Sequence, residues 1–276
     1  MNRVGISAPA LGWSHEAKCK FAIFYCVMIR KDVFDKIGML DEAFQEGAGE
    51  DTDFCRRAID AGFEQAEVGL PKVWDGGGMY IGNFPLYHKG EATVHQLENW
   101  PEKFERNRKL LEDRYKDRPL KLNLGSGIYV LPGYVNIDAD PGADYQGDVR
   151  KLRYADNSVD EVSSYHLFEH FSPYEVLDIL KEWYRVLKPG CKLCMELPDI
   201  AELCNRYASS TREERFVILA GIYGALPNIK VPHLYGWDRP NLAEVLSAAG
   251  FVNIVFGPQK IWHQGYNMRV ECQKKA

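Results

Sequence analysis

The stretch Lys121-Leu122-Asn123-Leu124-Gly125-Ser126-Gly127 decides the fold of this chain. Leu122 and Leu124 alternate with polar residues, which indicates a short strand, and the glycines after it indicate a tight turn. A second short strand, 134–138, follows soon after and ends in Asp138. Glycines allow a ligand to approach the backbone, and an acid ending the second strand can accept hydrogen bonds from ribose hydroxyls. The pattern predicts a nucleotide-like ligand at the edge of a parallel sheet.

Composition limits the class of protein. Hydrophobic residues make up 46% of the 276 residues and charged residues 26%, which is typical of a soluble globular chain. The net charge of −5, without a basic block, predicts no nucleic-acid partner. The longest apolar run, 21–29, is too short to span a bilayer, and no secretory signal precedes it. Seven cysteines, an odd number, suit a reducing compartment, so we expect a cytoplasmic protein without a transmembrane segment.

Strands and helices alternate after a boundary at Asp117-Arg118-Pro119, where proline stops the preceding helix. The predicted strands are 120–124, 134–138, 144–149, 159–164 and 192–197, with a final antiparallel pair at 252–256 and 267–271. The predicted helices are one that opens at Ser172-Pro173-Tyr174-Glu175, one over most of 200–226, and one at 241–249. This order predicts an α/β domain over 119–276 with a mostly parallel sheet.

Several short motifs accompany this order of elements. They are Leu122–Gly127, Pro132–Asp138, Asp148–Arg150, Tyr154–Asp160, His166–His170, Tyr184–Gly190 and Glu196–Asp199. Together they make residues 119–276 resemble a class I S-adenosylmethionine-dependent methyltransferase, and most of all the small methyltransferases found beside sugar and polysaccharide genes. The resemblance implies a Rossmann-like sheet with a C-terminal antiparallel hairpin, and S-adenosyl-L-methionine as cofactor.

The same resemblance implies where the cofactor lies. Its methionine part would lie near Gly125-Ser126-Gly127, its ribose on Asp138, and its adenine near Asp148-Val149. The alternative is that the two acids are solvated residues at strand ends. Two departures from the family pattern stand out, namely Asn123 in place of an acid and a connection after Gly125 that is too short for a full crossover helix. We therefore expect that helix to be absent or a single turn.

A group of histidines follows the predicted strand 159–164. His166 and His170 are spaced i, i+4 with Glu169 between them, and His233 lies on a later loop that could cover the site. Because ligands bind at the carboxyl ends of parallel strands, these four residues are the candidate catalytic set, with His166 or His233 as general base for a hydroxyl acceptor. Each histidine taken singly is better interpreted as a packing residue, but of the cluster as a whole we expect at least one to touch the site. With no third metal ligand evident, no metal is predicted.

Residues 1–118 predict a smaller α+β segment. Residues 1–20 lack periodicity and predict a loop, whereas 21–29 predicts a buried strand. A helix is expected at 31–37, and another after residue 49 that stops at Gly62. Short strands at 64–68 and 72–74 and a charged helix at 100–116 complete the segment.

Motifs in this first segment carry a second resemblance. They are Val27–Phe34, Gly38–Phe44, Gly49–Arg57, Ala61–Phe63, His88–Thr93 and Asn107–Leu111. They resemble the C-terminal half of a family 2 (GT-A) glycosyltransferase. The resemblance implies an acceptor site with a general base among Glu50, Asp51 and Asp53, and a role for His88 in metal or diphosphate binding. Acids at a helix start are also favoured by the helix dipole alone, without any such role.

The sugar-nucleotide half of that family, with its Asp-x-Asp site, has no counterpart before residue 21, so the segment is interpreted as a remnant or as a fragment of a longer chain, and glycosyl transfer by this segment alone is not expected. The leading functional hypothesis is a methyltransferase acting on a small molecule, sugar or glycan in polysaccharide biosynthesis. The alternative is a non-catalytic scaffold or regulatory module that partners a glycosyltransferase chain. An open cleft at Asp138 and His166 would favour the enzyme, and a filled apolar cleft at Gly125 the scaffold.

Overall fold

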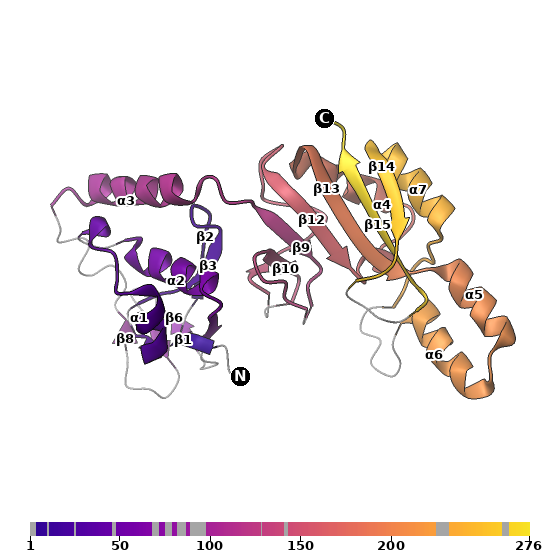
Figure 1. Cartoon of the computed structure of the whole chain (residues 1–276), viewed down its shortest axis with the longest axis horizontal. Helices are drawn as coiled ribbons and strands as arrows, with labels where there is room; N and C mark the ends of the chain where they lie inside the picture. The colour runs from indigo at the N-terminus through magenta and orange to yellow at the C-terminus, as the bar shows by residue number, and fades with distance from the viewer. Residues whose placement is uncertain are drawn as a thin grey trace. The chain divides into compact units, whose positions relative to one another are not determined.

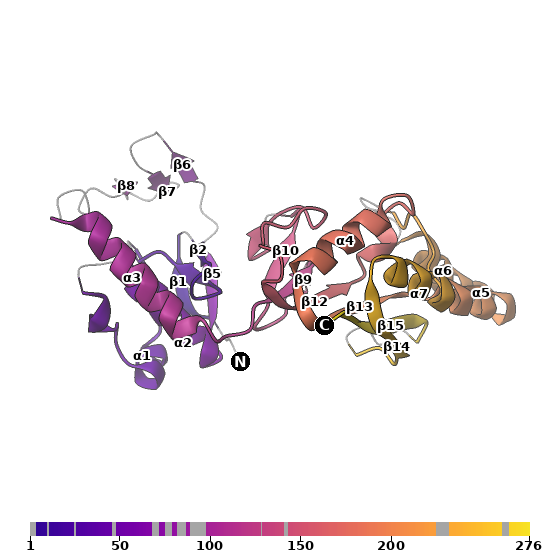
Figure 2. The same cartoon turned by 90° about the horizontal axis from the view of Figure 1, so that it is seen from above.

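The computed structural model describes residues 4–9, 11–24, 26–45, 48–67, 72–74, 79–81, 87–88, 98–127, 129–140, 143–224, 232–260 and 265–276. The chain divides into two compact units, Met1–Arg118 and Pro119–Ala276 (Figures 1 and 2). Each unit is described by itself below.

The first unit is a small α+β structure. Its elements are β1 (Val4–Ala8), β2 (Leu11–Ser14), β3 (Cys19–Ala22), β4 (Met28–Ile29), α1 (Lys31–Ile37), a 3₁₀ turn (Glu42–Phe44), α2 (Glu50–Asp60), β5 (Glu64–Glu67), β6 (Lys72–Trp74), β7 (Met79–Ile81), β8 (Tyr87–His88) and α3 (Trp100–Tyr115). Among the described residues the strands form three small sheets, in the orders β4-β1-β5, β2-β3 and β6-β7-β8. Strands β1 and β5 run parallel, and the other pairs are antiparallel.

Two predictions for the beginning of the chain are wrong. The expected loop over 1–20 contains β1 and β2, whose short sequences, Val-Gly-Ile-Ser-Ala and Leu-Gly-Trp-Ser, hold too few large apolar residues to show a period. The expected single strand over 21–29 is the end of β3 and all of β4, which pair with different strands, β2 and β1. An apolar run alone does not say whether the chain turns within it. The helix predicted at 31–37 is confirmed, and it ends at Gly38, whose φ is 78°.

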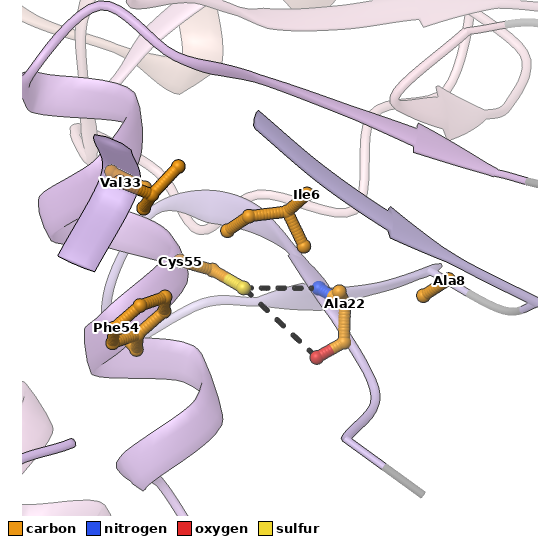
Figure 3. Close-up of a cluster of buried hydrophobic side chains, with 7 residues drawn as sticks. Ile6, Ala8, Ala22, Val33, Phe54 and Cys55 are labelled. Atoms are coloured by element: carbon orange, nitrogen blue, oxygen red, sulfur yellow. Dashed lines mark hydrogen bonds between the residues drawn. The ribbon is translucent and has the colours of Figure 1, made fainter. Parts of the chain in front are cut away.

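The core of the first unit joins the β4-β1-β5 sheet to α1 and α2 (Figure 3). Ile6, Val33 and Phe54, from β1, α1 and α2 respectively, are fully buried together. The Cys55 thiol on α2 lies 3.3 Å from the backbone nitrogen of Ala22 and 4.0 Å from its oxygen, which ties α2 to β3. The core therefore fixes the start of α2, where the predicted acidic residues lie.

The second unit is the predicted α/β domain. Its elements are β9 (Lys121–Leu124), β10 (Val135–Asp138), β11 (Tyr145–Gln146), β12 (Val159–Tyr165), the 3₁₀ turn η3 (Phe168–His170), α4 (Val176–Val186), β13 (Leu187–Pro198), α5 (Ile200–Ser209), α6 (Arg212–Tyr223), α7 (Arg239–Ala248), β14 (Phe251–Gly257) and β15 (Asn267–Lys274). The strand order is β11-β10-β9-β12-β13-β15-β14, with parallel pairs up to β13 and antiparallel pairs on both sides of β15. The first five strands have the Rossmann order, which places the switch point between β9 and β12.

One face of this sheet is apolar. A row of in-register partners crosses it, formed by Val135, Leu122, Val162, Leu193 and Cys272, each at most 2% exposed. Helices α4 and α7 lie against each other and carry buried apolar side chains to match. Burial of that many side chains, at about 1.5–3 kcal/mol each, is what attaches these helices to the sheet.

The opposite face of the sheet is polar. The next row of partners is Asn136, Asn123, Ser163, Cys194 and Glu271. No helix occurs in the described parts of the connections from β9 to β12, which confirms the expectation for the short connection after the glycine turn. Parallel sheets are usually covered by helices on both faces, which makes their strands apolar throughout, and the alternation seen here suits a sheet with helices on one face.

Loop backbone takes the place of the missing helix. The Asn123 side chain donates hydrogen bonds to Asn136 Oδ1 at 2.8 Å and to the Tyr129 carbonyl oxygen at 2.9 Å. The Leu131 amide donates to the same Asn136 oxygen at 2.8 Å. Amide side chains can hydrogen-bond to irregular backbone, whereas an acid at position 123 would place a charge beside that carbonyl oxygen. Asn123, which stands where the family pattern has an acid, thus suits the short connection, because its amide binds the loop backbone that replaces the helix.

The cysteines of the second unit should differ sharply in reactivity. Burial raises the pKa of the Cys194 thiol to about 11 and that of Cys272 to about 12, whereas Cys204 on α5 is exposed. Since the thiolate is the reactive form, we expect a thiol reagent at pH 8 to modify Cys204 in the folded protein and to reach Cys194 and Cys272 only on unfolding. Peptide mass mapping after timed labelling measures this. Equal labelling rates for Cys204 and Cys194 would contradict the burial described here.

Candidate functional site

The glycine turn is attached to the neighbouring strand. The backbone amides of Gly125 and Ser126 both donate to the carbonyl oxygen of Ile137, at 2.9 and 3.1 Å. Gly125 has a φ of 67° and Gly127 a φ of 49°, a region that glycine enters without steric cost. The sequence forms this turn because both positions lack a Cβ, and the turn brings the loop backbone to the carboxyl ends of β9 and β10.

Asp138 holds the other side of the turn. Its Oδ2 accepts a hydrogen bond from the Gly127 amide at 2.8 Å, and its Oδ1 accepts one from the Asp140 amide at 3.0 Å. A carboxylate offers about four acceptor positions, so each oxygen keeps capacity for a further donor such as a ribose hydroxyl. The predicted ribose-binding residue thus lies at the turn.

The turn is open on one side and filled on the other. At Gly127 no atom lies within 4 Å of where a Cβ would be, but a Cβ on Gly125 would lie only 2.6 Å from the Leu167 side chain. Ser126 is 2% exposed, and among the described residues its hydroxyl oxygen has no hydrogen-bond partner. A buried hydroxyl without a partner beside open space fits the polar methionine end of the cofactor. Leu167 limits how deeply a ligand reaches at Gly125.

The predicted adenine position borders a pocket of about 420 Å³, lined in part by Ile137, Tyr145 and Asp148. Arg150, which donates to the Asp148 carboxylate, holds the pKa of that carboxyl below its usual value. Val149 does not line the pocket but turns into the core, where its carbonyl oxygen accepts a hydrogen bond from Trp183 Nε1 at 2.9 Å. Asp148 can therefore contact a ligand, whereas Val149 supports α4.

The histidine cluster forms around Glu169. The chain folds so that β12 ends at Tyr165, and η3 turns the Glu169 side chain inward to 2% exposure. His166 Nδ1 lies 3.2 Å from Glu169 Oε1, and His166 Nε2 lies 3.1 Å from the side-chain nitrogen of Asn267. His166 has a φ of 51°, a conformation that non-glycine residues rarely adopt and that clusters at functional sites.

His233 reaches the same cluster from the later loop. The amide of Leu234 donates to the Glu169 carbonyl oxygen at 2.8 Å, which fixes the loop against η3. His233 Nε2 then lies 3.9 Å from Glu169 Oε1, and the rings of His170 and His233 meet edge to face with centroids 4.9 Å apart. The four residues predicted as the catalytic set are thus brought together by the fold.

The charges of the cluster follow from this packing. Burial opposes ionisation of Glu169 most strongly, but the facing His166 ring and nearby His170 bring the pKa of the carboxyl below its usual value. Burial lowers the pKa of the His233 imidazole, and the Glu169 carboxylate offsets this only in part. The cluster therefore holds a carboxylate beside a neutral imidazole at pH 7.

The sequence showed no third metal ligand near His170 and Glu169, but the fold brings one to the cluster. The third ligand that seemed to be missing is His233, because Glu169, His170 and His233 each offer an atom within 4.8 Å of the others. Sequence spacing could not reveal this, since the distance along the chain from η3 to His233 carries no metal-binding pattern. Asn267 was also missed. It begins β15, whose pairing with β13 sets Asn267 opposite Pro198 at the carboxyl edge of the sheet.

In the first unit, Asp53 is part of the core. It is fully buried and accepts hydrogen bonds from Arg57 Nε, Arg114 Nη1 and the Tyr115 hydroxyl at 2.8, 2.6 and 2.7 Å. Arg57 lies on α2 with Asp53, whereas Arg114 and Tyr115 come from α3, so the carboxylate joins the two helices. Because it is fully buried and already holds three donors, Asp53 is not available as the base that the resemblance implied.

Asp51 has a different environment from Asp53. It lines a pocket of about 480 Å³ together with Trp13, Phe21 and Phe104, and burial raises the pKa of its carboxyl. Burial also raises the pKa of Glu50. The backbone of His88 lies in β8, but its side chain falls outside the described residues. The only predicted acceptor-site acid that lines this pocket among the described residues is therefore Asp51.

Comparison with known proteins adds to this geometry. A family model described as "Methyltransferase domain" matches residues 76–195, a range that begins before Pro119 and ends within β13. The match covers less than half of the chain, and over these residues the chain is similar to methyltransferases. The residues at the glycine turn fit S-adenosylmethionine as a methyl donor, because the Ser126 hydroxyl has no described partner and Asp138 keeps acceptor positions. No curated protein sequence matched the chain.

Solved structures of methyltransferases are similar to the chain at low identity. A S-adenosylmethionine-dependent methyltransferase from Methanosarcina mazei is 18% identical, with 59% of this chain and 96% of that chain covered and a TM-score of 0.43. One from Archaeoglobus fulgidus is 14% identical, with 63% and 98% covered and a TM-score of 0.40. Phosphoethanolamine N-methyltransferase 2 of Haemonchus contortus, in complex with S-adenosyl-L-methionine, is 12% identical, with 57% and 49% covered and a TM-score of 0.40.

No helix among the described residues is long and apolar enough to cross a membrane.

Proposed function

We propose that the methyltransferase domain transfers the methyl group of S-adenosylmethionine to a hydroxyl of a sugar or glycan. Gly125, Ser126, Gly127 and Asp138 hold the cofactor, with Asp148 at its far end. The observation that supports this most is the Ser126 hydroxyl, buried without a described partner beside the open position at Gly127. The histidine cluster at the end of β12 is on the same carboxyl edge of the sheet, where open α/β folds bind ligands.

The bound cofactor supplies a methyl group that its sulfonium already activates, so the protein has to position the acceptor and take its proton. Of the two proposed bases, His233 suits the second task better. Its Nδ1 donates to the Gly221 carbonyl oxygen at 3.0 Å, which leaves the lone pair on Nε2. His166 Nε2 instead accepts from Asn267. Glu169, 3.9 Å from His233 Nε2, would stabilise the imidazolium that forms.

A carbohydrate acceptor is supported by two observations. The motifs of the domain resemble methyltransferases found beside polysaccharide genes, and the first unit has motifs that resemble a glycosyltransferase acceptor half. Its pocket places the Asp51 carboxyl beside Trp13, Phe21 and Phe104, and aromatic rings are surfaces on which sugar rings stack. We therefore propose that the first unit binds carbohydrate at this pocket.

Calorimetry with S-adenosylmethionine tests the cofactor site. Wild-type protein should bind one equivalent, and Asp138→Ala should weaken binding about 10- to 100-fold, the loss of a charge-assisted hydrogen bond worth roughly 1.5–3 kcal/mol. Asp140→Ala, an exposed acid on the same loop, is the matched control and should bind as wild type. Absence of binding at millimolar cofactor by folded wild-type protein would refute the proposal.

Leu167 supports the second candidate, a scaffold that binds no cofactor. Its side chain lies against Gly125, where the methionine part of the cofactor would come closest. In a scaffold, Leu167→Ala would only remove packing and would leave the cofactor unbound. In an enzyme, the same change would preserve or strengthen cofactor binding in the calorimeter.

A further inference from the structure

We propose that Glu169, His170 and His233 form a binding site for a divalent transition metal, with Zn²⁺ the ion that best suits these ligands. Two imidazoles, one carboxylate and an open position are the ligand set of catalytic zinc sites. Their candidate ligand atoms lie within 4.8 Å of one another. Metal bonds near 2.0–2.1 Å place two tetrahedral ligands about 3.4 Å apart, so the cluster needs to contract by about 1 Å.

The burial and charge of the Glu169 carboxylate are the main support for a bound cation. Its side chain is 3% exposed, and among the described residues the nearest partners of its carboxylate are the imidazoles of His166 and His233. The nearest donor, His166 Nδ1, lies 3.2 Å away at ion-pair distance. A buried carboxylate of this kind costs several kcal/mol unless it is paired or coordinates a metal. Two oxygens facing three imidazoles provide the negative charge that a cation needs.

The two histidines are held in the form that binds a metal. His170 Nδ1 lies 3.0 Å from the Pro232 carbonyl oxygen, and His233 Nδ1 lies 3.0 Å from that of Gly221. A carbonyl oxygen only accepts, so each Nδ1 carries the proton and each Nε2 the lone pair. A backbone carbonyl on the second ring nitrogen is the usual outer partner of a metal-ligating histidine.

His166 and Asn267 complete the surroundings. Asn267 donates to His166 Nε2, so His166 presents Nδ1–H to the Glu169 carboxylate and orients it. His166 is 21% exposed and His233 13%, so an ion and an acceptor oxygen can reach the cluster from solvent. His166 is thus a positioning residue for the carboxylate.

The role of the ion, as distinct from its binding, rests on the proposed methyl transfer. A hydroxyl coordinated to Zn²⁺ loses its proton far more readily than a free one, as bound water does. With His233 as a ligand, the ion rather than an imidazole would prepare the acceptor oxygen, and the proton of the hydroxyl would leave to solvent, because both nitrogens of His166 are already in contact with Asn267 and Glu169. The acceptor class that this selects is a hydroxyl.

Metal binding is tested without cofactor or acceptor, so its result is separate from that of the methyl-transfer proposal. Tag-free protein is stripped with a chelator and titrated with Zn²⁺ in a calorimeter against a competing chelator. We expect one Zn²⁺ per chain, and at least about 100-fold weaker binding by His170→Ala, His233→Ala and Glu169→Gln. His15→Ala, an exposed histidine of the first unit, is the control and should bind as wild type.

A second measurement uses only the wild-type chain and does not depend on whether a variant folds. Diethyl pyrocarbonate modifies accessible imidazoles, and peptide mass mapping gives the rate at each. Zn²⁺ should slow modification of His170 and His233 at least tenfold and leave His15 unchanged. The inference is overturned if folded wild-type protein binds no stoichiometric Zn²⁺, or if His170→Ala and His233→Ala bind it as tightly as wild type. In that case Glu169 serves only to hold the histidines together.

Discussion

Replacing Asp53 by alanine is expected to lower the free energy of unfolding of the first unit by about 3 kcal/mol, the low end of what breaking a buried ion pair costs. The carboxylate is fully buried and holds Arg57, Arg114 and the Tyr115 hydroxyl. Removing it leaves the buried Tyr115 hydroxyl without this acceptor, whereas Arg57 keeps two backbone carbonyl oxygens and Arg114 keeps Asp41. The two arginines are 27% and 30% exposed and regain some hydration, which keeps the loss from being larger.

The measurement for Asp53→Ala is denaturant unfolding followed by hydrogen exchange of peptides from α2 and α3. Asp51→Ala is the matched control, because it is an acid in the same first turn of α2 that lines a pocket. We expect the control to change stability by less than about 1 kcal/mol, the size of a helix-dipole interaction. A loss of similar size in both variants would contradict the structural role assigned to Asp53 alone.

Replacing Trp183 by alanine is expected to destabilise the second unit by about 4 kcal/mol, as for other large aromatic residues removed from a core. Trp183 is fully buried on α4, lies against Phe168 of η3, and donates its indole N–H to Val149. It therefore joins the main helix to both the histidine turn and the loop at the adenine position. The loss should appear in hydrogen exchange of β9 to β13.

Two further variants separate packing from hydrogen bonding at this position. Trp183→Phe keeps most of the ring contact but leaves the Val149 carbonyl oxygen without its donor, which should cost about 1–3 kcal/mol. Tyr174→Ala, at a residue 97% exposed just before α4, should leave stability unchanged. If Trp183→Phe proves as damaging as Trp183→Ala, the hydrogen bond rather than the packing carries the effect.

The second unit could be predicted well from its sequence because its patterns are local. Alternation in Leu122-Asn123-Leu124 and the glycines after it reflect a real strand and turn, and the count of residues up to β10 leaves no room for a helix. Alternation within one short strand does not by itself predict a sheet with one apolar and one polar face. That property appears only when Asn123, Asn136 and Ser163 are placed in register.

The candidate site was predictable in part. His166, Glu169 and His170 lie within one turn, so their proximity follows from their spacing. The position of His233 depends on the loop contact between Leu234 and Glu169, and that of Asn267 on strand pairing across the sheet, neither of which leaves a local pattern. Asp53 shows the opposite case. Its motif resembled an acceptor site, but the donors that occupy it come from α3, far along the chain.

The one-sided sheet has a consequence for how the second unit comes to be folded. Its apolar face is covered by α4, which starts at Val176, and by α7, which starts at Arg239. Both helices are therefore synthesised after β9, β10 and β12. A growing chain that has reached β12 thus holds the first four strands of this unit, with Leu122 and Val162 exposed and no helix to bury them. Domains generally fold as units during synthesis, so this domain can bury its apolar face only after its later helices have emerged from the ribosome. In that interval its strands are open to pairing with other nascent chains, and a chaperone that shields apolar strands would protect it.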